Sequence, residues 1–331
     1  MEDAIAAAYA QATIARAAAD ANPTVTLWLM GEGSSLAIAP PRGATSVPAF
    51  DRGWLAPDGG REPFIVYVDE DPSVNWSDDL EQLHEESTRT HFIDQWTRGA
   101  IVGGLGTLTV EPVIVDVGCS TGHLLEDLSR LLPDAILIGV DLVASGLVKA
   151  HRAAPTARLL HADACALPLA DATVDAIVSA NLLEHVPDDA AALREMARVL
   201  RPGARAAIVV PAGPSTYDYY DRFLGHERRY ARGELAAKAR AAGMEVIEER
   251  AIAALLYPPF WLVKQRNRRR HGQLEGAALQ ARVASDIART KDSRVGRALW
   301  RAEEGLRRLR VSLPCGIRWL VVARRPPQGR S

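Results

Sequence analysis

A glycine-bearing turn is the first segment of this 331-residue chain whose residues could do chemistry. It reads Asp116-Val-Gly-Cys-Ser-Thr-Gly122 and follows the apolar run Pro112–Val117. Its two glycines lack side chains, so the backbone of a tight strand-to-helix turn can approach a ligand closely. A dinucleotide fingerprint starting at Gly118 would need small residues where Ser120 and His123 stand. The turn therefore predicts a ligand site and weakens a pyrophosphate interpretation.

Two more carboxylates stand at the ends of strand-like runs. Asp141 follows Ile136–Val140 and lies 25 positions after Asp116. A carboxylate at such a strand end can accept hydrogen bonds from two ribose hydroxyls. Asp163 stands in Leu160-His-Ala-Asp-Ala164, the segment that ends the run beginning at Ala157. We expect both carboxylates in the same ligand crevice as the glycine turn.

The elements that must position these residues alternate between strands and helices. Short, continuous apolar runs are typical of a parallel sheet that is covered on both faces. The alternation predicts an α/β fold with a doubly wound, seven-stranded, mostly parallel sheet and right-handed crossovers. The expected strands are Pro112–Val117, Ala135–Val140, Ala157–Leu160, Val174–Ala180, Arg205–Val210, Met244–Glu249 and Gly316–Ala323, and the expected helices are Gly122–Leu131, Ala144–His151, Ala190–Leu200 and Arg232–Ala242.

Together these segments resemble class I S-adenosylmethionine-dependent methyltransferases of the bacterial small-molecule and glycan type, with a methyltransferase type 11-like domain. The likeness rests on Val113–Gly122, on Asp141 and Asp163 after their runs, on Val174–Val186, and on Arg201-Pro-Gly203. It implies a Rossmann-like fold and S-adenosyl-L-methionine as the cofactor.

The resemblance also assigns the cofactor contacts. Asp116 and the glycine turn would hold the amino-acid part, and Asp163 would contact the adenine amino group beside the small Ala164. Asn181 and Leu182 would border the methionine arm and the acceptor. One departure is Ser120, which replaces the family's middle glycine. The full set of expected cofactor residues is Asp116, Gly118, Ser120, Gly122, Asp141, Leu142, Asp163, Ala164, Asn181 and Leu182.

Catalysis on an oxygen acceptor also requires the loss of a proton, where a general base contributes about 10²–10⁴-fold. His185 is one candidate, because it lies just past the strand end that faces the ligand crevice. The block Gly225-His-Glu-Arg-Arg-Tyr230 is similar to blocks in bacterial members of the family, which implies that His226, Arg229 and Tyr230 lie near the acceptor. A structurally packed histidine and a loop that merely caps the sheet remain the alternatives.

No metal is expected in this chain. Glu184-His185 is similar to the end of a metal-binding ExxEH arrangement in some O-methyltransferases of this fold, but Asn181 stands at the first acidic position. The three cysteines, Cys119, Cys165 and Cys315, form no CxxC pair and have no metal-ligand spacing. A disulfide framework is equally disfavoured.

The chain is expected to comprise four regions. Strand-like runs at Thr24–Met30 and Phe64–Asp69 and an Ala-rich helix at Asp3–Ala21 are assigned to an N-terminal appendage, and a helical pattern begins at Trp76. The regions are an appendage at 1–75, a cofactor-binding core at 76–250, a helical insertion or lid at 251–314, and the last core strand with a tail at 315–331.

Charge is distributed unevenly along the chain. The net charge is −2, but residues 251–331 hold 18 Lys and Arg against 5 Asp and Glu. The longest apolar run, Ala251–Val263, has 13 residues and two prolines, short of the ~20 that a spanning helix needs. With no secretory signal pattern at the start, we expect a cytoplasmic protein that contacts a membrane surface peripherally through residues 251–270. A hydrophobic helix packed on the core, with its basic end solvated, is the alternative.

The predicted function is methyl transfer, most readily to a hydroxyl of a small molecule, a glycan or a lipid-linked intermediate. One alternative is a nicotinamide-dependent oxidoreductase, which the missing fingerprint opposes. The other is a non-catalytic RNA-binding module that keeps the fold. A nucleic-acid partner is disfavoured because the C-terminal arginines lack interleaved aromatic residues.

Overall fold

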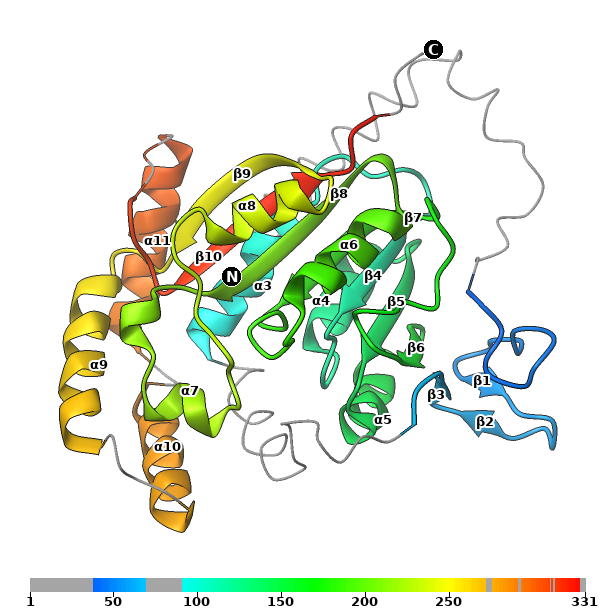
Figure 1. The fold of residues 1–331 in the computed structure, drawn as a ribbon, viewed down its shortest axis with the longest axis horizontal. Coiled ribbons are helices and arrows are strands. Elements are labelled where there is room, and N and C mark those ends of the chain that lie inside the picture. Colours follow the sequence, from blue (N-terminus) through cyan, green and yellow to red (C-terminus); the bar gives the residue numbers. More distant parts are fainter. Residues whose placement is uncertain are drawn as a thin grey trace.

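The structure is a computed structural model and describes residues 38–69, 91–271, 276–290, 293–309, 311 and 313–327. The helix expected at Asp3–Ala21 and the run Thr24–Met30 lie outside the described residues, as does the start of the helical pattern at Trp76. Figure 1 shows a central sheet with helices around it and a small hairpin, β1 (Trp54–Leu55) and β2 (Arg61–Glu62), at its edge.

The central sheet has eight strands in the order β3-β6-β5-β4-β7-β8-β10-β9. Neighbours pair in parallel from β3 to β8, and β10 pairs antiparallel with both β8 and β9. This arrangement confirms the doubly wound α/β class. The strands are β3 (Phe64–Val66), β4 (Val113–Val117), β5 (Ile136–Asp141), β6 (Arg158–His161), β7 (Val174–Ala180), β8 (Leu200–Pro211), β9 (Glu245–Ile252) and β10 (Arg318–Arg324).

Among the described residues the sheet has one strand more than the predicted seven, and it comes from the expected appendage. β3 pairs in parallel with β6, with Phe64 opposite Leu159 and Val66 opposite His161. The indole nitrogen of Trp54 in β1 also donates to the carbonyl of Leu159 at 3.0 Å. The sequence showed the strand propensity of this segment, but a three-residue edge strand carries no local sign of its distant partner.

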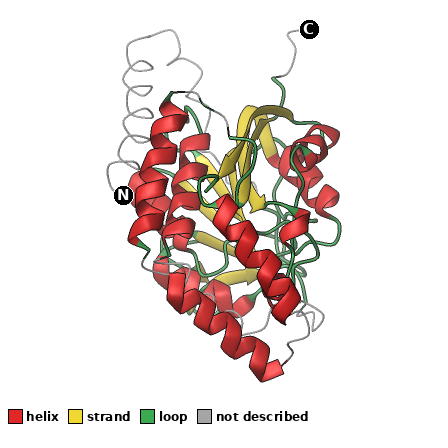
Figure 2. Cartoon of the chain, turned by 90° about the vertical axis from the view of Figure 1, so that its left-hand side faces the viewer, coloured by secondary structure: helices red, strands yellow, loops and turns green. Residues whose placement is uncertain are grey.

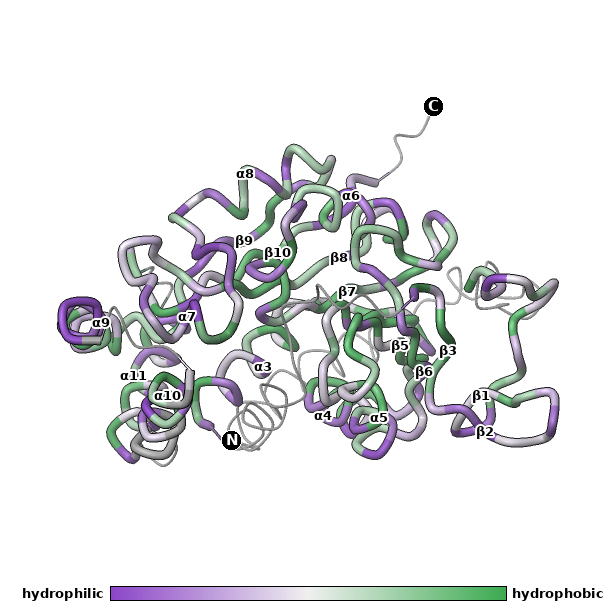
Figure 3. Tube along the Cα trace, turned by 60° about the horizontal axis from the view of Figure 1, so that its bottom comes forward, coloured by the Kyte–Doolittle hydropathy of each residue, from purple (hydrophilic) through white to green (hydrophobic). Residues whose placement is uncertain are grey.

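Helices cover both faces of the sheet, as Figure 2 shows in side view. Successive strand residues point to opposite faces, so Val113 and Val115 pack with the core beneath α6 (Asp189–Val199) and α8 (Glu234–Ala241). Ile114 packs with the core beneath the helices of the other face. Those helices are α3 (Phe92–Gly104), α4 (His123–Leu131) and α5 (Ala144–Ala153). Hydrophobic segments accordingly gather in the strands in Figure 3.

Three helices follow β9 and precede β10, where the helical insertion was expected. They are α9 (Tyr257–His271), α10 (Gly276–Thr290) and α11 (Arg294–Arg308). α11 packs on α3, with the rings of Trp96 and Trp300 stacked at 5.7 Å, while α9 and α10 lie beside the short α7 (Tyr219–Phe223). Within the described residues, no helix is both long and apolar enough to cross a membrane.

Candidate functional site

A cavity of about 1220 Å³ opens where β4, β5, β6 and β7 end. It extends from these strand ends to α7, α9 and α10, so the core and the helical insertion share it. A small cavity of about 80 Å³ adjoins it through the shared residues Gly118, Ser120 and Asn181. Of the predicted cofactor residues, those lining the large cavity are Gly118, Ser120, Asp141, Leu142, Asp163, Ala164, Asn181 and Leu182.

The glycine turn has the tight geometry that its sequence predicted. Gly118 has a φ of 81°, and a Cβ there would lie 2.8 Å from Cβ of Leu182. Ser120 adopts a φ of 44° although it is not glycine. Its backbone N–H donates to Oδ2 of Asp141 at 2.8 Å, which helps to hold this costly conformation in place. The departure at Ser120 therefore leaves the turn intact.

Asp141 ties two cofactor loops together. Its Oδ2 accepts from Ser120 in the loop after β4, and its Oδ1 accepts from the N–H of Val143 at 2.9 Å in the loop after β5. Burial raises the pKa of Asp141, although these backbone hydrogen bonds oppose the shift. Asp163 is anchored similarly, since its Oδ1 accepts from the N–H of Cys165 at 2.8 Å.

Asp116 lies deeper, in the wall of the small cavity. It is 1% exposed, and burial together with the nearby charge of Asp141 raises its pKa to about 8. Gly122, with a φ of 80°, contributes through close packing, because a Cβ there would lie 2.8 Å from Cα of Ala150 in α5. The structure thus brings the predicted cofactor residues together at one edge of the sheet.

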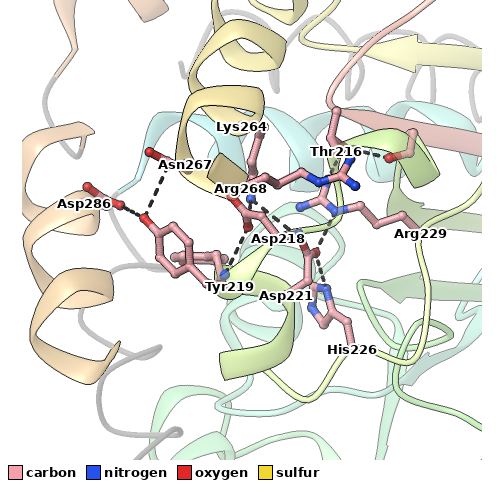
Figure 4. Close-up of polar contacts among 12 residues, drawn as sticks. Thr216, Asp218, Tyr219, Asp221, His226, Arg229, Lys264, Asn267, Arg268 and Asp286 are labelled. Carbon is pink, nitrogen blue, oxygen red and sulfur yellow. Dashed lines mark hydrogen bonds and ion pairs between the residues drawn. The ribbon is translucent and has the colours of Figure 1, made fainter. Parts of the chain in front are cut away.

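The opposite end of the cavity is built on a buried ionic network centred on Asp221, shown in Figure 4. Its Oδ1 accepts from Nδ1 of His226 at 2.9 Å and from Nε of Arg229 at 2.6 Å. Nζ of Lys264 lies 3.7 Å from Oδ2 of Asp221 and 2.6 Å from Oδ1 of Asp218. Burial opposes ionisation of Asp221, but these three partners hold its pKa far below the usual range.

A second set of contacts joins the short α7 to the insertion. The hydroxyl of Tyr219 bonds to the carboxylate of Asp286 in α10. The side-chain amide of Asn267 in α9 donates to the same hydroxyl at 3.3 Å. Because Tyr219, Asn267 and Asp286 all line the cavity, the insertion forms one of its walls. The sequence alone pointed to none of these residues, nor to Asp218, Asp221 and Lys264. Most of their partners lie dozens of positions away. His226 and Arg229 are close to Asp221 along the chain, but the sequence does not show that Asp221 is buried.

The predicted catalytic residues divide into two groups. His185, His226 and Arg229 line the cavity, and the rings of His185 and His226 meet edge to face at 4.7 Å. Burial lowers the pKa of His226, while Asp221 opposes that shift. Tyr230 instead lies in the core, fully buried, with its hydroxyl 2.6 Å from Oδ2 of Asp189. That placement supports a role in packing and does not bring Tyr230 to the cavity.

Glu184 is a cavity residue that the sequence left without a role. It is fully buried, and burial raises its pKa to about 8 despite the nearby charges of Arg318 and Arg229. Neither of its carboxylate oxygens forms a hydrogen bond with another described residue.

Known proteins match the part of the chain that forms the cofactor end. Residues 115–208 match the family model described as a methyltransferase domain. Demethylmenaquinone methyltransferase of Roseiflexus sp. (strain RS-1) is 33% identical over 156 residues, which are 44% of this chain and 61% of that protein. Trans-aconitate 2-methyltransferase of Azoarcus sp. (strain BH72) is 35% identical over 144 residues, 44% of this chain and 53% of that protein. The chain therefore spans about three fifths or less of the length of these relatives.

A solved structure supports the fold independently. Phosphoethanolamine N-methyltransferase 2 of Haemonchus contortus, in complex with S-adenosyl-L-methionine, superposes with a TM-score of 0.51 at 16% identity, over 77% of this chain and 59% of that one. The likeness at this identity concerns the fold alone. Together with the family match, it confirms that this chain carries a class I S-adenosylmethionine-dependent methyltransferase domain.

Proposed function

We propose that the protein transfers a methyl group from S-adenosyl-L-methionine to a hydroxyl of a small molecule, a glycan or a lipid-linked intermediate. The observation that carries the proposal is the single cavity that joins the cofactor edge of the sheet to the helical insertion. Its volume of about 1220 Å³ exceeds the roughly 300–1,000 Å³ typical of a site for one small ligand. It therefore has room for a donor and an acceptor side by side.

The cofactor end suits the groups of S-adenosyl-L-methionine. Asp116 is a buried carboxylate whose ionisation the site opposes, so a cationic amino group beside it would be strongly favoured. Asp141 and Asp163, which line the large cavity, supply acceptors for ribose hydroxyls and for an adenine amino group. When bound, the cofactor supplies an electrophilic methyl group on a positively charged sulfur.

The acceptor end would hold the hydroxyl in line with that methyl group. Alignment of two reactants can supply about 7–11 kcal/mol of a barrier, which makes positioning the main task of the protein. The Asp221 network fixes His226 and Arg229 in the cavity wall, and residues of α9 and α10 line the same cavity, which supports a lid role for the helical insertion. His226 and His185 remain the candidates for proton removal.

A calorimetric titration tests the assignment of the donor. We expect S-adenosyl-L-methionine and S-adenosylhomocysteine to bind with micromolar affinity, and Asp141→Ala to weaken both by about tenfold or more, because it removes charged hydrogen bonds worth roughly 1.5–3 kcal/mol each. Asp69→Ala, which alters an exposed carboxylate that does not line the cavity, should bind like the unmodified chain. Tighter binding of NAD than of either sulfur compound would refute the proposal in favour of the oxidoreductase alternative.

Acceptor screening follows once donor binding is established. The names of the two relatives above refer to different acceptors. The screen therefore covers several classes of hydroxyl-bearing compound and does not start from either named acceptor. Hydroxyl-bearing glycans, phenols and lipid-linked sugars would be compared by formation of S-adenosylhomocysteine. Salt-sensitive RNA binding without turnover would instead support the non-catalytic module.

The exposed surface of α9 supports a peripheral membrane contact at residues 251–270. Trp261, Leu262 and Val263 are 40%, 62% and 54% exposed, and four arginines follow within the same helix. Apolar residues beside basic ones suit an anionic lipid surface. Val263 also lines the cavity, so a lipid-linked acceptor could reach the site from that surface.

Vesicle sedimentation tests this contact. The chain should bind phosphatidylglycerol vesicles and not phosphatidylcholine vesicles, and Leu262→Ser should weaken the binding. Val295→Ser, at an equally exposed apolar position on α11, is the matched control. Equal binding of both variants, or none by the unmodified chain, would rule the contact out.

A further inference from the structure

Glu184 is a buried carboxylate that lacks the hydrogen-bond partners such a group normally has. The residue follows β7, is fully buried and lines the large cavity. Its two oxygens make no hydrogen bond with another described residue. Buried polar groups are nearly always hydrogen-bonded, and buried charges are paired or bound to metals. This carboxylate therefore calls for a partner that enters the cavity.

Two histidine side chains, those of His185 and His226, lie close to the Glu184 carboxylate. Glu184, His185 and His226 each offer one donor atom, and the three atoms lie within 4.8 Å of one another. Glu184 and His185 come from the turn after β7, whereas His226 comes from the loop after α7. The fold brings them together from segments about forty positions apart.

A hydrogen bond to Asp221 orients the imidazole ring of His226. The Asp221 carboxylate can only accept, so the imidazole proton lies on Nδ1, which donates to Oδ1 at 2.9 Å. The other ring nitrogen, Nε2, then keeps its lone pair. Arg229 and Lys264 hold Asp221 in turn, as Figure 4 shows. A carboxylate that fixes the tautomer of a histidine is typical of the support around metal-binding histidines.

We infer that Glu184, His185 and His226 form a binding site for a divalent transition-metal cation in the acceptor end of the cavity. Two imidazoles and one carboxylate are the donor set of catalytic zinc sites, which keep a further position open. Donors about 2.0–2.2 Å from a tetrahedral zinc ion lie about 3.3–3.6 Å apart. A pair of donor atoms at the 4.8 Å limit would therefore need to close by about 1.2–1.5 Å, so the side chains would move when the cation binds.

Nearby positive charges do not block this site. Arg229 is engaged by Asp221, and Arg318 donates to Oδ1 of Asp94 at 2.6 Å. The sequence predicted no metal because Asn181 stands at the first acidic position of the ExxEH arrangement, where a third donor would be expected. The structure supplies His226 instead, from a segment that the local motif does not include.

The role of the cation rests on the proposed function. Its open position would accept the oxygen of the acceptor hydroxyl, hold it at the acceptor end and lower its pKa. The proton of the hydroxyl would pass to water at the mouth of the cavity. Under this inference the two histidines act as ligands of the cation and do not take the proton themselves.

Metal titration tests the site without relying on turnover. Protein treated with EDTA and then dialysed would be titrated with Zn²⁺ by calorimetry and with Co²⁺ by visible absorption. We expect one equivalent to bind, and Glu184→Gln and His226→Ala each to weaken binding by at least about tenfold, the lower bound for residues that only support a metal site. His151→Ala on α5, away from the cavity, should bind as the unmodified chain does and controls for the loss of a histidine.

Parallel titration with S-adenosyl-L-methionine separates this inference from the proposed function. Glu184→Gln should lose the metal and keep the cofactor, whereas Asp141→Ala should lose the cofactor and keep the metal. If Glu184→Gln does not fold, as judged by its melting curve, His185→Ala replaces it. Weak binding without a fixed stoichiometry, or binding that the ligand variants leave unchanged, would overturn the inference.

Discussion

Alanine at Gly122 should damage the cofactor turn much more than alanine at a geometrically matched glycine elsewhere. Gly122 is the N-cap of α4 with a φ of 80°, and Gly233 is the N-cap of α8 with a φ of 81°. The backbone penalty of alanine in the left-handed region, about 1–2 kcal/mol, applies equally to both. Only their surroundings differ.

The atoms around each glycine determine how much the stability losses of the two variants differ. A Cβ at Gly122 would lie 2.8 Å from both Cα and Cβ of Ala150, whereas a Cβ at Gly233 would have nothing within 4 Å. Forcing an atom into a packed position costs typically 1–3 kcal/mol. Gly122→Ala should therefore lose about 1–3 kcal/mol more than Gly233→Ala, and each kcal/mol lowers the melting temperature by about 2–4 °C in a domain of this size class.

Thermal melting and cofactor titration would check this. Gly122→Ala should also bind S-adenosyl-L-methionine about tenfold more weakly, a loss of 1.4 kcal/mol, since α4 and the turn must move away from α5. Ala150→Gly should rescue only part of the loss, because Cα of Ala150 stays in place. Equal melting temperatures and equal affinities for Gly122→Ala and Gly233→Ala would refute the packing argument.

Three further outcomes are expected. With its pKa raised to about 8, Asp116 is protonated at pH 7 and must ionise to bind a cationic amino group. Cofactor binding should therefore release close to one proton and tighten as the pH rises toward about 8. Calorimetry in buffers of different ionisation enthalpy measures this proton release, which Asp116→Asn should abolish together with the pH dependence. Lys264→Met leaves two buried carboxylates without their lysine and should cost about 3–5 kcal/mol of unfolding free energy, against little for Arg269→Met on the exposed side of the same helix. Tyr230→Phe removes the bond to Asp189 and should cost about 1 kcal/mol with turnover per folded molecule nearly unchanged, so a large loss of turnover at normal stability would restore its predicted catalytic role.

The cofactor end could be predicted from sequence because its signals are local. Each residue that matters there stands directly after an apolar strand, and in a parallel sheet those strand ends share one edge. For that reason Asp141 and Asp163 line the large cavity, and Asp116 lines the small cavity that adjoins it. The carboxyl ends of the strands that carry these residues lie within one residue of their predicted places, as at β5, which runs to Asp141. Elsewhere the shifts are larger, since β8 begins at Leu200 and not at Arg205.

The acceptor end could not be predicted in the same way, because it depends on contacts between distant segments. Asp221 and Lys264 read as ordinary charged residues of a loop and a helix, yet each is buried in the structure. Tyr230 looked like an aromatic residue for the acceptor, but the loop turns its hydroxyl toward Asp189 in α6. The edge strand β3 was missed as part of the sheet for the same reason, since its partner β6 lies almost a hundred positions away.

The Asp221 network is better explained by the side chains and helices that it holds in place than by a contribution to the stability of the fold. Burying two carboxylates, an arginine and a lysine carries a desolvation penalty that their attraction often only offsets, so apolar residues of similar size could serve stability as well. What apolar residues could not do is fix the proton of His226 on Nδ1. Nor could they tie α7 to α9 through Lys264 and Asp218. The network orients one imidazole and anchors the wall of the cavity where we propose that the acceptor binds. Its removal should therefore disturb acceptor binding before it disturbs the cofactor edge.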